Sequence, residues 1–152
     1  MNESGLSRSE VVAMVGGVLL AVGLFLTWYH TDNRNDSING TPGPHDFSGW
    51  DVHTTARWFL LLAAVAPLIL AWIIYRGHAL SWPRGEVTAV SAIAALGLVV
   101  YLTIINKPGT TSSLTHLRYG VFVSLLGAAL MLGGSATRAS SVERPRKPPG
   151  TI

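Results

Sequence analysis

Four long apolar segments, separated by polar stretches, dominate this 152-residue chain. They cover Val11–Trp28, Trp58–Tyr75, Val87–Ile105 and Tyr119–Ala136, and their middles are free of charged residues. A helix rises about 1.5 Å per residue and the hydrocarbon core of a bilayer is about 30 Å thick, so roughly 20 apolar residues are needed to cross it. The pattern therefore predicts an all-α fold, a bundle of four transmembrane helices.

The remaining residues are divided unequally among loops and ends. The long first loop, 30–57, is rich in Asp, Asn, Gly and Pro, and its segment 39–44 predicts turns. Ser48 followed by Asp51 resembles a helix capping box, so we expect the second helix to begin outside the membrane and run inward. Residues 138–152 contain prolines and basic residues but few apolar ones, which predicts a disordered basic tail after a membrane domain at 1–137.

Lys and Arg are distributed asymmetrically between the two sides of the predicted bundle. Four of the eleven lie in the first and third loops, and the other seven lie in the N-terminal segment, the second loop and the tail: Arg8, Arg76, Arg84, Arg138, Arg144, Arg146 and Lys147. The positive-inside rule then predicts that both termini are cytoplasmic and that the first loop faces outward. The first apolar run is too long for a secretory signal and lacks a small-residue cleavage site, so we expect an uncleaved helix in a multi-pass plasma-membrane protein.

Aromatic and basic residues cluster where the predicted spans end. Aromatic rings favour headgroup depth, and long basic side chains reach toward it. The residues assigned to the lipid headgroup region or interface are Trp28, Tyr29, Trp50, Arg57, Trp58, Arg118 and Tyr119. Arg57 and Arg118 occupy matching positions at the outer mouths of the second and fourth helices. They either clamp an anionic headgroup or, the favoured interpretation, extend individually to the interface.

Small residues recur at helical spacing within the spans. Because water does not drive helices together inside lipid, residues that permit close backbone approach become important. The glycines expected at helix-packing contacts are Gly16, Gly17, Gly23, Gly120 and Gly127. They predict that the first and fourth helices are packed in the interior or at an interface, whereas the second is more exposed to lipid. Pro67 predicts a kink in the second helix, with a gating hinge as the alternative.

Composition excludes several classes of chemistry. Charged residues make up 12 %, about half the usual share in soluble domains. The absence of cysteine excludes disulfides, thiolate metal sites and thiol redox chemistry. The spans lack the buried charges that mark ion or proton pathways, and no phosphate-binding loop, zinc-protease helix or nucleophile elbow occurs. We expect a non-enzymatic protein without a cofactor. Because the basic residues are scattered, we expect a lipid bilayer and no nucleic acid as partner.

The first loop brings imidazole and carboxylate groups together in sequence. The weak candidates for metal ligands are His45, Asp46, Asp51 and His53. These ligand types suit divalent metals, but their spacing matches no known pattern. If the segment is helical, Asp51 and His53 point to different faces. Ordinary polar residues in a solvated loop are therefore the favoured interpretation.

Three short patterns together resemble a known group of proteins. Residues 26–29 (LTWY) close the first helix, residues 47–51 (FSGWD) lead into the second, and residues 106–109 (NKPG) precede 118–122 (RYGVF) and a Gly-rich last helix. The chain is similar in these respects to uncharacterised small four-helix integral membrane proteins of actinobacteria. The resemblance implies an architecture and no activity.

These observations favour an accessory or structural subunit of a larger membrane assembly. Its expected partners are other membrane protein subunits or further copies of the chain, since the predicted helix faces are apolar and carry small residues. One alternative is a small oligomeric transport or channel component, whose path would use the few polar residues of the last two spans: Thr88, Ser91, Thr103 and Ser124. A second alternative is an envelope sensor that uses the outer loop.

Overall fold

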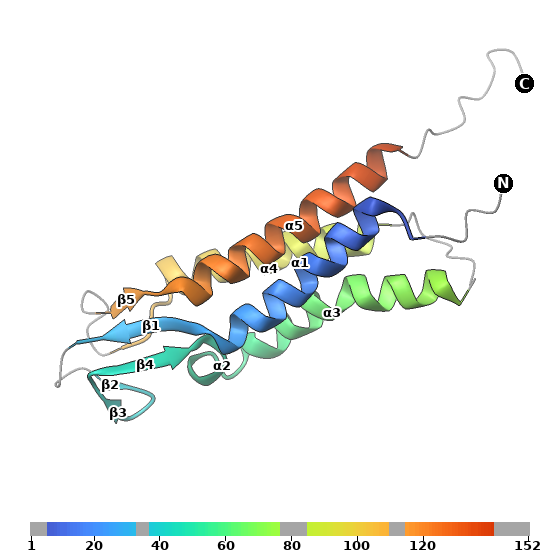
Figure 1. Ribbon diagram of the computed structural model, residues 1–152. Coiled ribbons are helices and arrows are strands. Elements are labelled where there is room, and N and C mark those ends of the chain that lie inside the picture. Colours follow the sequence, from blue (N-terminus) through green and yellow to red (C-terminus); the bar gives the residue numbers. More distant parts are fainter. Residues whose placement is uncertain (1–5, 33–36, 77–84, 110–114, 142–152) are drawn as a thin grey trace, which may run out of the picture.

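The computed structural model describes residues 6–32, 37–76, 85–109 and 115–141, with side chains to residue 137. Its four long helices are α1 (Arg8–Phe25), α3 (Ala56–Tyr75), α4 (Glu86–Ile104) and α5 (Tyr119–Ser141). Each is long and apolar enough to cross a membrane by length and composition. The helices run alongside one another, and the start of α1 and the end of α5 lie at the same end (Figure 1). The prediction of a four-helix bundle is confirmed.

The helix ends follow local hydrogen bonding rather than the limits of the apolar runs. α1 begins three residues before its predicted start because Ser7 and Glu10 form a capping box. The Ser7 amide donates to the Glu10 carboxylate at 2.7 Å, and the Glu10 amide donates to the Ser7 hydroxyl at 3.3 Å. α5 extends to Ser141, beyond the predicted end of its span. Most of the predicted tail, 142–152, lies outside the described residues.

The prediction of an all-α fold is wrong at one end of the bundle. Within the described residues five strands form there: β1 (Thr27–Thr31), β2 (Ser37–Ile38), β3 (Thr41–Pro42), β4 (His45–Ser48) and β5 (Thr115–Leu117). β1 lies between β4 and β5 in an antiparallel sheet, and β2 pairs with β3. We call β1–β4, α2 (Gly49–Val52) and β5 the cap (Figure 1).

The chain leaves the first helix earlier than predicted. α1 ends at Phe25, and residues 27–31, a run of Thr and aromatic residues, form β1. Such residues favour strands, and here partners lie on both sides of the strand. Trp28 was predicted to close a helix because the apolar run is continuous through it. Hydrophobicity alone does not separate the end of a helix from a buried strand.

The long first loop is folded rather than irregular. Asn39 and Gly40 both have positive φ, 52° and 77°, and join β2 to β3 as expected for a two-residue hairpin turn. The Ser48 hydroxyl accepts from the Asp51 amide at 3.1 Å and caps α2. The predicted capping residue is thus confirmed, but α2 is a single turn. The expected continuous helix is wrong, because residues 53–55 separate α2 from α3.

Close contacts at glycine hold the helices together. A Cβ added at Gly16 would lie 2.6 Å from the Gly127 carbonyl oxygen, so α1 and α5 approach backbone to backbone. The most extensive contact between elements is that of α1 with α5. Gly17 faces Pro67 of α3, Gly23 faces Ser124, and Gly120 faces the backbone of β1. All five glycines expected at packing contacts therefore lie at close approaches.

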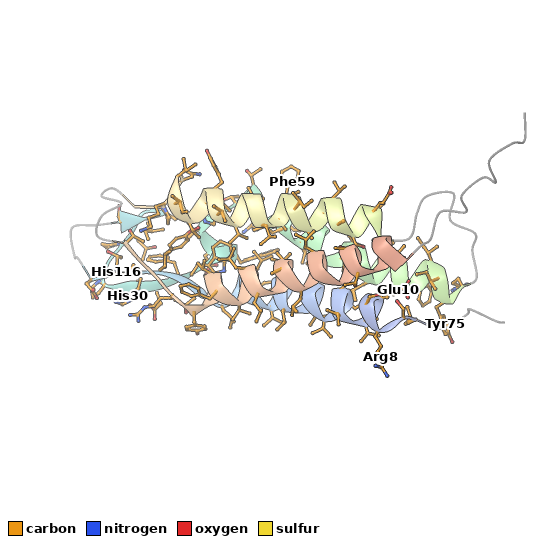
Figure 2. The ribbon with its side chains drawn as sticks, turned by 90° about the horizontal axis from the view of Figure 1, so that it is seen from above. Arg8, Glu10, His30, Phe59, Tyr75 and His116 are labelled. Atoms are coloured by element: carbon orange, nitrogen blue, oxygen red, sulfur yellow. The ribbon has the colours of Figure 1, made fainter. Side chains whose placement is uncertain are left out.

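The outward faces of the helices are apolar. Large side chains such as Val18, Leu62, Val90 and Phe122 are exposed along the bundle, as they would be toward lipid. α1 and α5 bury a larger share of their spans than α3 and α4 do. In Figure 2, side chains project outward along the bundle, with Arg8 and Tyr75 at one end and His30 and His116 at the other.

We predict that Gly16→Ala lowers the apparent melting temperature of the detergent-solubilised protein. The added methyl group meets backbone atoms of α5, and overpacking of this kind costs about 1–3 kcal/mol. Gly97→Ala is the matched control, because a Cβ there has no heavy atom within 4 Å. Equal melting temperatures for the two variants would contradict the assigned α1–α5 crossing.

Candidate binding site beneath the cap

Strand β1 directs two large aromatic residues into the interior. Trp28 and Tyr29 are both fully buried. The Trp28 indole Nε1 donates to the Gly23 carbonyl at 2.8 Å. Gly49 and Gly120 leave room for the indole, since a Cβ at Gly49 would lie 2.6 Å from that ring. The assignment of Trp28 and Tyr29 to the lipid headgroup region is therefore wrong. The cap encloses both rings, and the indole N–H has a hydrogen-bond partner within the protein.

Tyr29 joins the cap to two distant parts of the chain. Its hydroxyl lies 2.9 Å from His53 Nε2 and donates to the Leu102 carbonyl at 3.2 Å. Since the hydroxyl has one proton, this arrangement makes His53 Nε2–H the donor to the Tyr29 oxygen and leaves Nδ1 unprotonated. The His53 ring also packs edge-on against Trp28 and Tyr29, with centroids 5.7 and 5.6 Å away.

Burial sets the protonation states of this pair. His53 is 8 % exposed, and the loss of solvation lowers its pKa from 6.5 to about 4. Burial also raises the pKa of Tyr29 above its ordinary value. Both side chains are therefore neutral at neutral pH, which lets them serve as hydrogen-bonding groups without a counter-ion.

His53 forms part of the wall of two hollows. One, of about 410 Å³, is also lined by Thr54, Thr55 and Tyr101. The other, of about 220 Å³, lies toward Ile38 and Asn39 of the hairpin. Val52, His53 and Asn106 line both. The buried imidazole thus stands at the boundary between a polar space under the cap and a space that extends toward α3 and α4.

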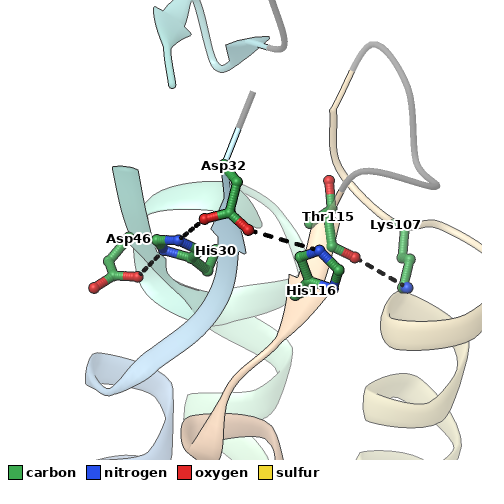
Figure 3. A network of polar contacts seen from close by, with 6 residues as sticks. All are labelled: His30, Asp32, Asp46, Lys107, Thr115 and His116. Carbon is green, nitrogen blue, oxygen red and sulfur yellow. Dashed lines mark hydrogen bonds and ion pairs between the residues drawn. The ribbon is translucent and has the colours of Figure 1, made fainter. Parts of the chain in front are cut away.

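A second polar cluster crosses the sheet in a row. Asp46 of β4 and His116 of β5 stand opposite His30 of β1. His30 Nδ1 and Nε2 lie 2.6 Å from the carboxylates of Asp46 and Asp32, and His116 Nε2 lies 3.8 Å from Asp32 (Figure 3). Hydrogen bonds to Asp46 and then Asp32 raise the pKa of His30, partly opposed by Arg118. When both ring nitrogens carry protons, His30 donates to both carboxylates and joins β1 to Asp46 of β4.

Hydrogen bonds connect the segment that follows α4 to strand β5 of the same sheet. The Lys107 ammonium donates to the Thr115 carbonyl at 3.3 Å (Figure 3). The Thr115 hydroxyl donates to the Pro108 carbonyl at 3.1 Å. These bonds close the described part of the third loop against β5.

The four weak metal candidates do not converge. His45 and Asp46 lie in β4, with Asp46 bonded to His30. Asp51 accepts a hydrogen bond from the Ser48 hydroxyl in α2, and His53 is buried against Tyr29. Among the described residues no group of three or more His, Asp or Glu side chains is arranged to hold a metal ion.

The remaining interface candidates have separate environments. Trp58 and Tyr119 are exposed near the cap ends of α3 and α5. The Arg57 guanidinium lies over the rings of Trp50 and Trp58, at 4.8 and 5.5 Å, and donates to the Trp50 carbonyl at 3.1 Å. Arg118 is exposed, and within the described part of the chain it shares no polar contact with Arg57, so the two do not form a clamp.

Sequence reasoning missed the Tyr29–His53 pair. The two residues are 24 positions apart, and Leu102 is a further partner 73 positions from Tyr29. No local spacing indicates such a contact. By contrast, His30 and Asp32 are two apart in an extended segment, and that spacing places side chains on one face of a strand. A strand predicted at residues 27–31 would therefore have placed His30 and Asp32 on the same face.

Comparison of the chain with protein-family models, curated proteins and solved structures finds no match. The resemblance to small actinobacterial membrane proteins therefore stays a prediction.

We predict that Tyr29→Phe destabilises the protein by about 1–3 kcal/mol, because it leaves the buried Leu102 carbonyl and His53 Nε2 without their shared partner. The measurement is equilibrium unfolding in detergent. Tyr119→Phe removes a hydroxyl from an exposed ring and serves as the control. A Tyr29→Phe variant as stable as the control would show that the shared hydrogen bonds contribute nothing.

The pKa shifts of His53 and His30 predict that the free energy of unfolding is largest at an intermediate pH and falls toward both lower and higher pH. Because the pKa of folded His53 is about 4, only the unfolded chain binds a proton there as pH falls from 6.5 to 4, and stability drops by up to about 3 kcal/mol. The raised pKa of His30 has the opposite sign. Its contribution is complete below pH 6.5 and is lost as pH rises through the folded-state pKa.

Melting temperatures measured from pH 4 to pH 9 show both decreases. His30→Gln should reduce the decrease in melting temperature at alkaline pH, the alkaline limb of the pH profile, and leave the decrease at acidic pH, the acidic limb, in place. His116→Gln, at the exposed edge of the same row, should change the alkaline limb much less. An alkaline limb unchanged by His30→Gln would remove the role assigned to that imidazole.

Proposed function

We propose that this protein is a non-enzymatic accessory or structural subunit of a larger assembly in the plasma membrane. In the proposed orientation both termini are cytoplasmic and the cap faces outward, as the distribution of Lys and Arg favours. The observation that carries the proposal is the folded cap, which is fixed to a four-helix bundle by the buried residues Trp28, Tyr29 and His53. A folded domain with polar residues on its surface, attached to membrane helices, is suited to protein contact.

The distribution of charge within the helices supports this role over transport. Within the candidate spans of the described residues, 8–25, 56–75, 86–104 and 119–137, charged residues occur only in first helical turns: Arg8, Glu10, Arg57 and Glu86. A pathway for ions or protons normally requires charged or ionisable groups farther inside. Such groups are missing from the interior of these spans.

Two of the four hydroxyl groups that would line a transport path, those of Thr103 and Ser124, are used within their own helices. Thr103 donates to the Val99 carbonyl at 2.8 Å, and Ser124 donates to the Gly120 carbonyl at 2.9 Å. Both are buried in the bundle. Side chains bonded to the preceding turn do not offer their donors to a passing solute.

Site-specific photo-crosslinking in native membranes tests the proposal. A photoreactive amino acid is placed at His45 or His116, which are exposed on the two edge strands of the cap, and at Val18 on the apolar face of α1 as a control. We expect a discrete adduct of fixed mass from a cap position, and the same partner or a second copy in stoichiometric amounts after purification in mild detergent. A monodisperse monomer without adducts from either cap position would overturn the proposed role.

A further inference from the structure

The helices α3 and α4 are separated by an apolar groove. It has a volume of about 520 Å³ and lies between small residues of both helices, including Ala63, Ala66, Ser91 and Ala94. Phe59 and Leu98 stand at its cap end. Among neighbouring long helices, α3 and α4 make the least contact with each other. The groove is within the volume range of about 300–1,000 Å³ that small-molecule sites occupy.

The groove continues into the two hollows beneath the cap. Phe59 and Leu98 line both the groove and the 410 Å³ hollow. Val52, His53 and Asn106 then line both that hollow and the 220 Å³ hollow. The three spaces therefore form one series along the α3–α4 side, from the apolar span to the buried imidazole.

Polarity changes in one direction along this series. The groove lining is apolar except for Ser91. The hollows at its end add the side chains of His53, Thr54, Thr55, Asn39 and Asn106. Among the described residues that line the three spaces, none is Lys, Arg, Asp or Glu. The nearby cations are engaged elsewhere, Arg57 with Trp50 and Lys107 with the Thr115 carbonyl.

We propose that the α3–α4 groove and the hollows under the cap bind a single-chain, uncharged amphiphile. Its hydrocarbon chain would lie in the groove, and its hydroxyl or ester head would bond to His53, Thr55 and Asn106. The absence of cations in the lining disfavours a phosphate headgroup, which charged donors bind best. A transmembrane helix of another subunit matches the groove but offers no match for the polar end. The inference is independent of the proposed accessory role.

The chemistry of the polar end suits a neutral head. The His53 Nδ1 is unprotonated in the arrangement set by Tyr29, so it can accept a hydrogen bond from a ligand hydroxyl. Thr55 precedes α3 without a side-chain capping bond, so its hydroxyl is available to a ligand. Polar groups of this kind, at the end of an apolar space, orient a ligand rather than supply most of its affinity.

Competitive photolabelling of the full chain in nanodiscs tests the proposal. The probe is a monoacylglycerol with a photoreactive diazirine in its chain, and a phosphatidylglycerol with the same chain is the comparison. We expect the monoacylglycerol to label α3 and α4 along the groove and unlabelled monoolein to abolish that labelling. Ala66→Phe should weaken it by about tenfold by filling the groove, whereas Val22→Phe, on the exposed face of α1, should not.

The polar end is tested separately with Thr55→Val and Asn106→Leu, which should weaken competition by monoolein while the melting temperature stays unchanged. Three results would overturn the proposal. They are uniform labelling around all four helices, stronger labelling by the phosphatidylglycerol probe, and cross-linking through the groove to a second protein with no competition by monoolein.

Discussion

The close approach of α1 and α5 is the constraint on which the rest of the structure depends. Gly16 and Gly127 have no side chains at the crossing, so the two backbones lie so close that a Cβ would not fit between them. β1 follows α1 in the chain and β5 precedes α5, so antiparallel packing of the helices brings these strands side by side. The Arg118 amide, which donates to the Trp28 carbonyl at 2.8 Å, continues the contact from the helices into the sheet. The cap is thus an extension of a helix–helix contact.

The cap in turn changes what its aromatic residues do. At a bare helix end, Trp28 and Tyr29 would meet lipid headgroups and water. Once β4 and β5 flank β1, both rings are enclosed, and their polar atoms bond to Gly23, His53 and Leu102. Enclosure also removes water from His53, which stays neutral and becomes a fixed hydrogen-bonding group at the end of the α3–α4 side. The electrostatic character of the candidate site therefore derives from the sheet.

Small residues have opposite consequences on the two sides of the bundle. On α1 and α5 they face each other and permit intimate contact, which is the usual effect in membrane helices. On α3 and α4 they line a space instead, because these helices do not approach closely enough to close it. The same residue type thus brings α1 and α5 into close contact and lines an open groove between α3 and α4. A fixed cap above an open groove connects the two proposals, one for a protein partner and one for a membrane ligand.

The sequence by itself determined the four spans, because length and hydrophobicity suffice for membrane-crossing helices. It also determined the glycine contacts, the turn at Asn39 and Gly40, and the role of Ser48 as a helix cap, since each depends on local stereochemistry. Tertiary structure alone decided that Trp28 and Tyr29 are buried and that His53 meets Tyr29. An aromatic residue after an apolar run has the same local pattern whether it ends at lipid or enters a sheet. The outcome depends on strands from distant segments that supply its hydrogen-bond partners.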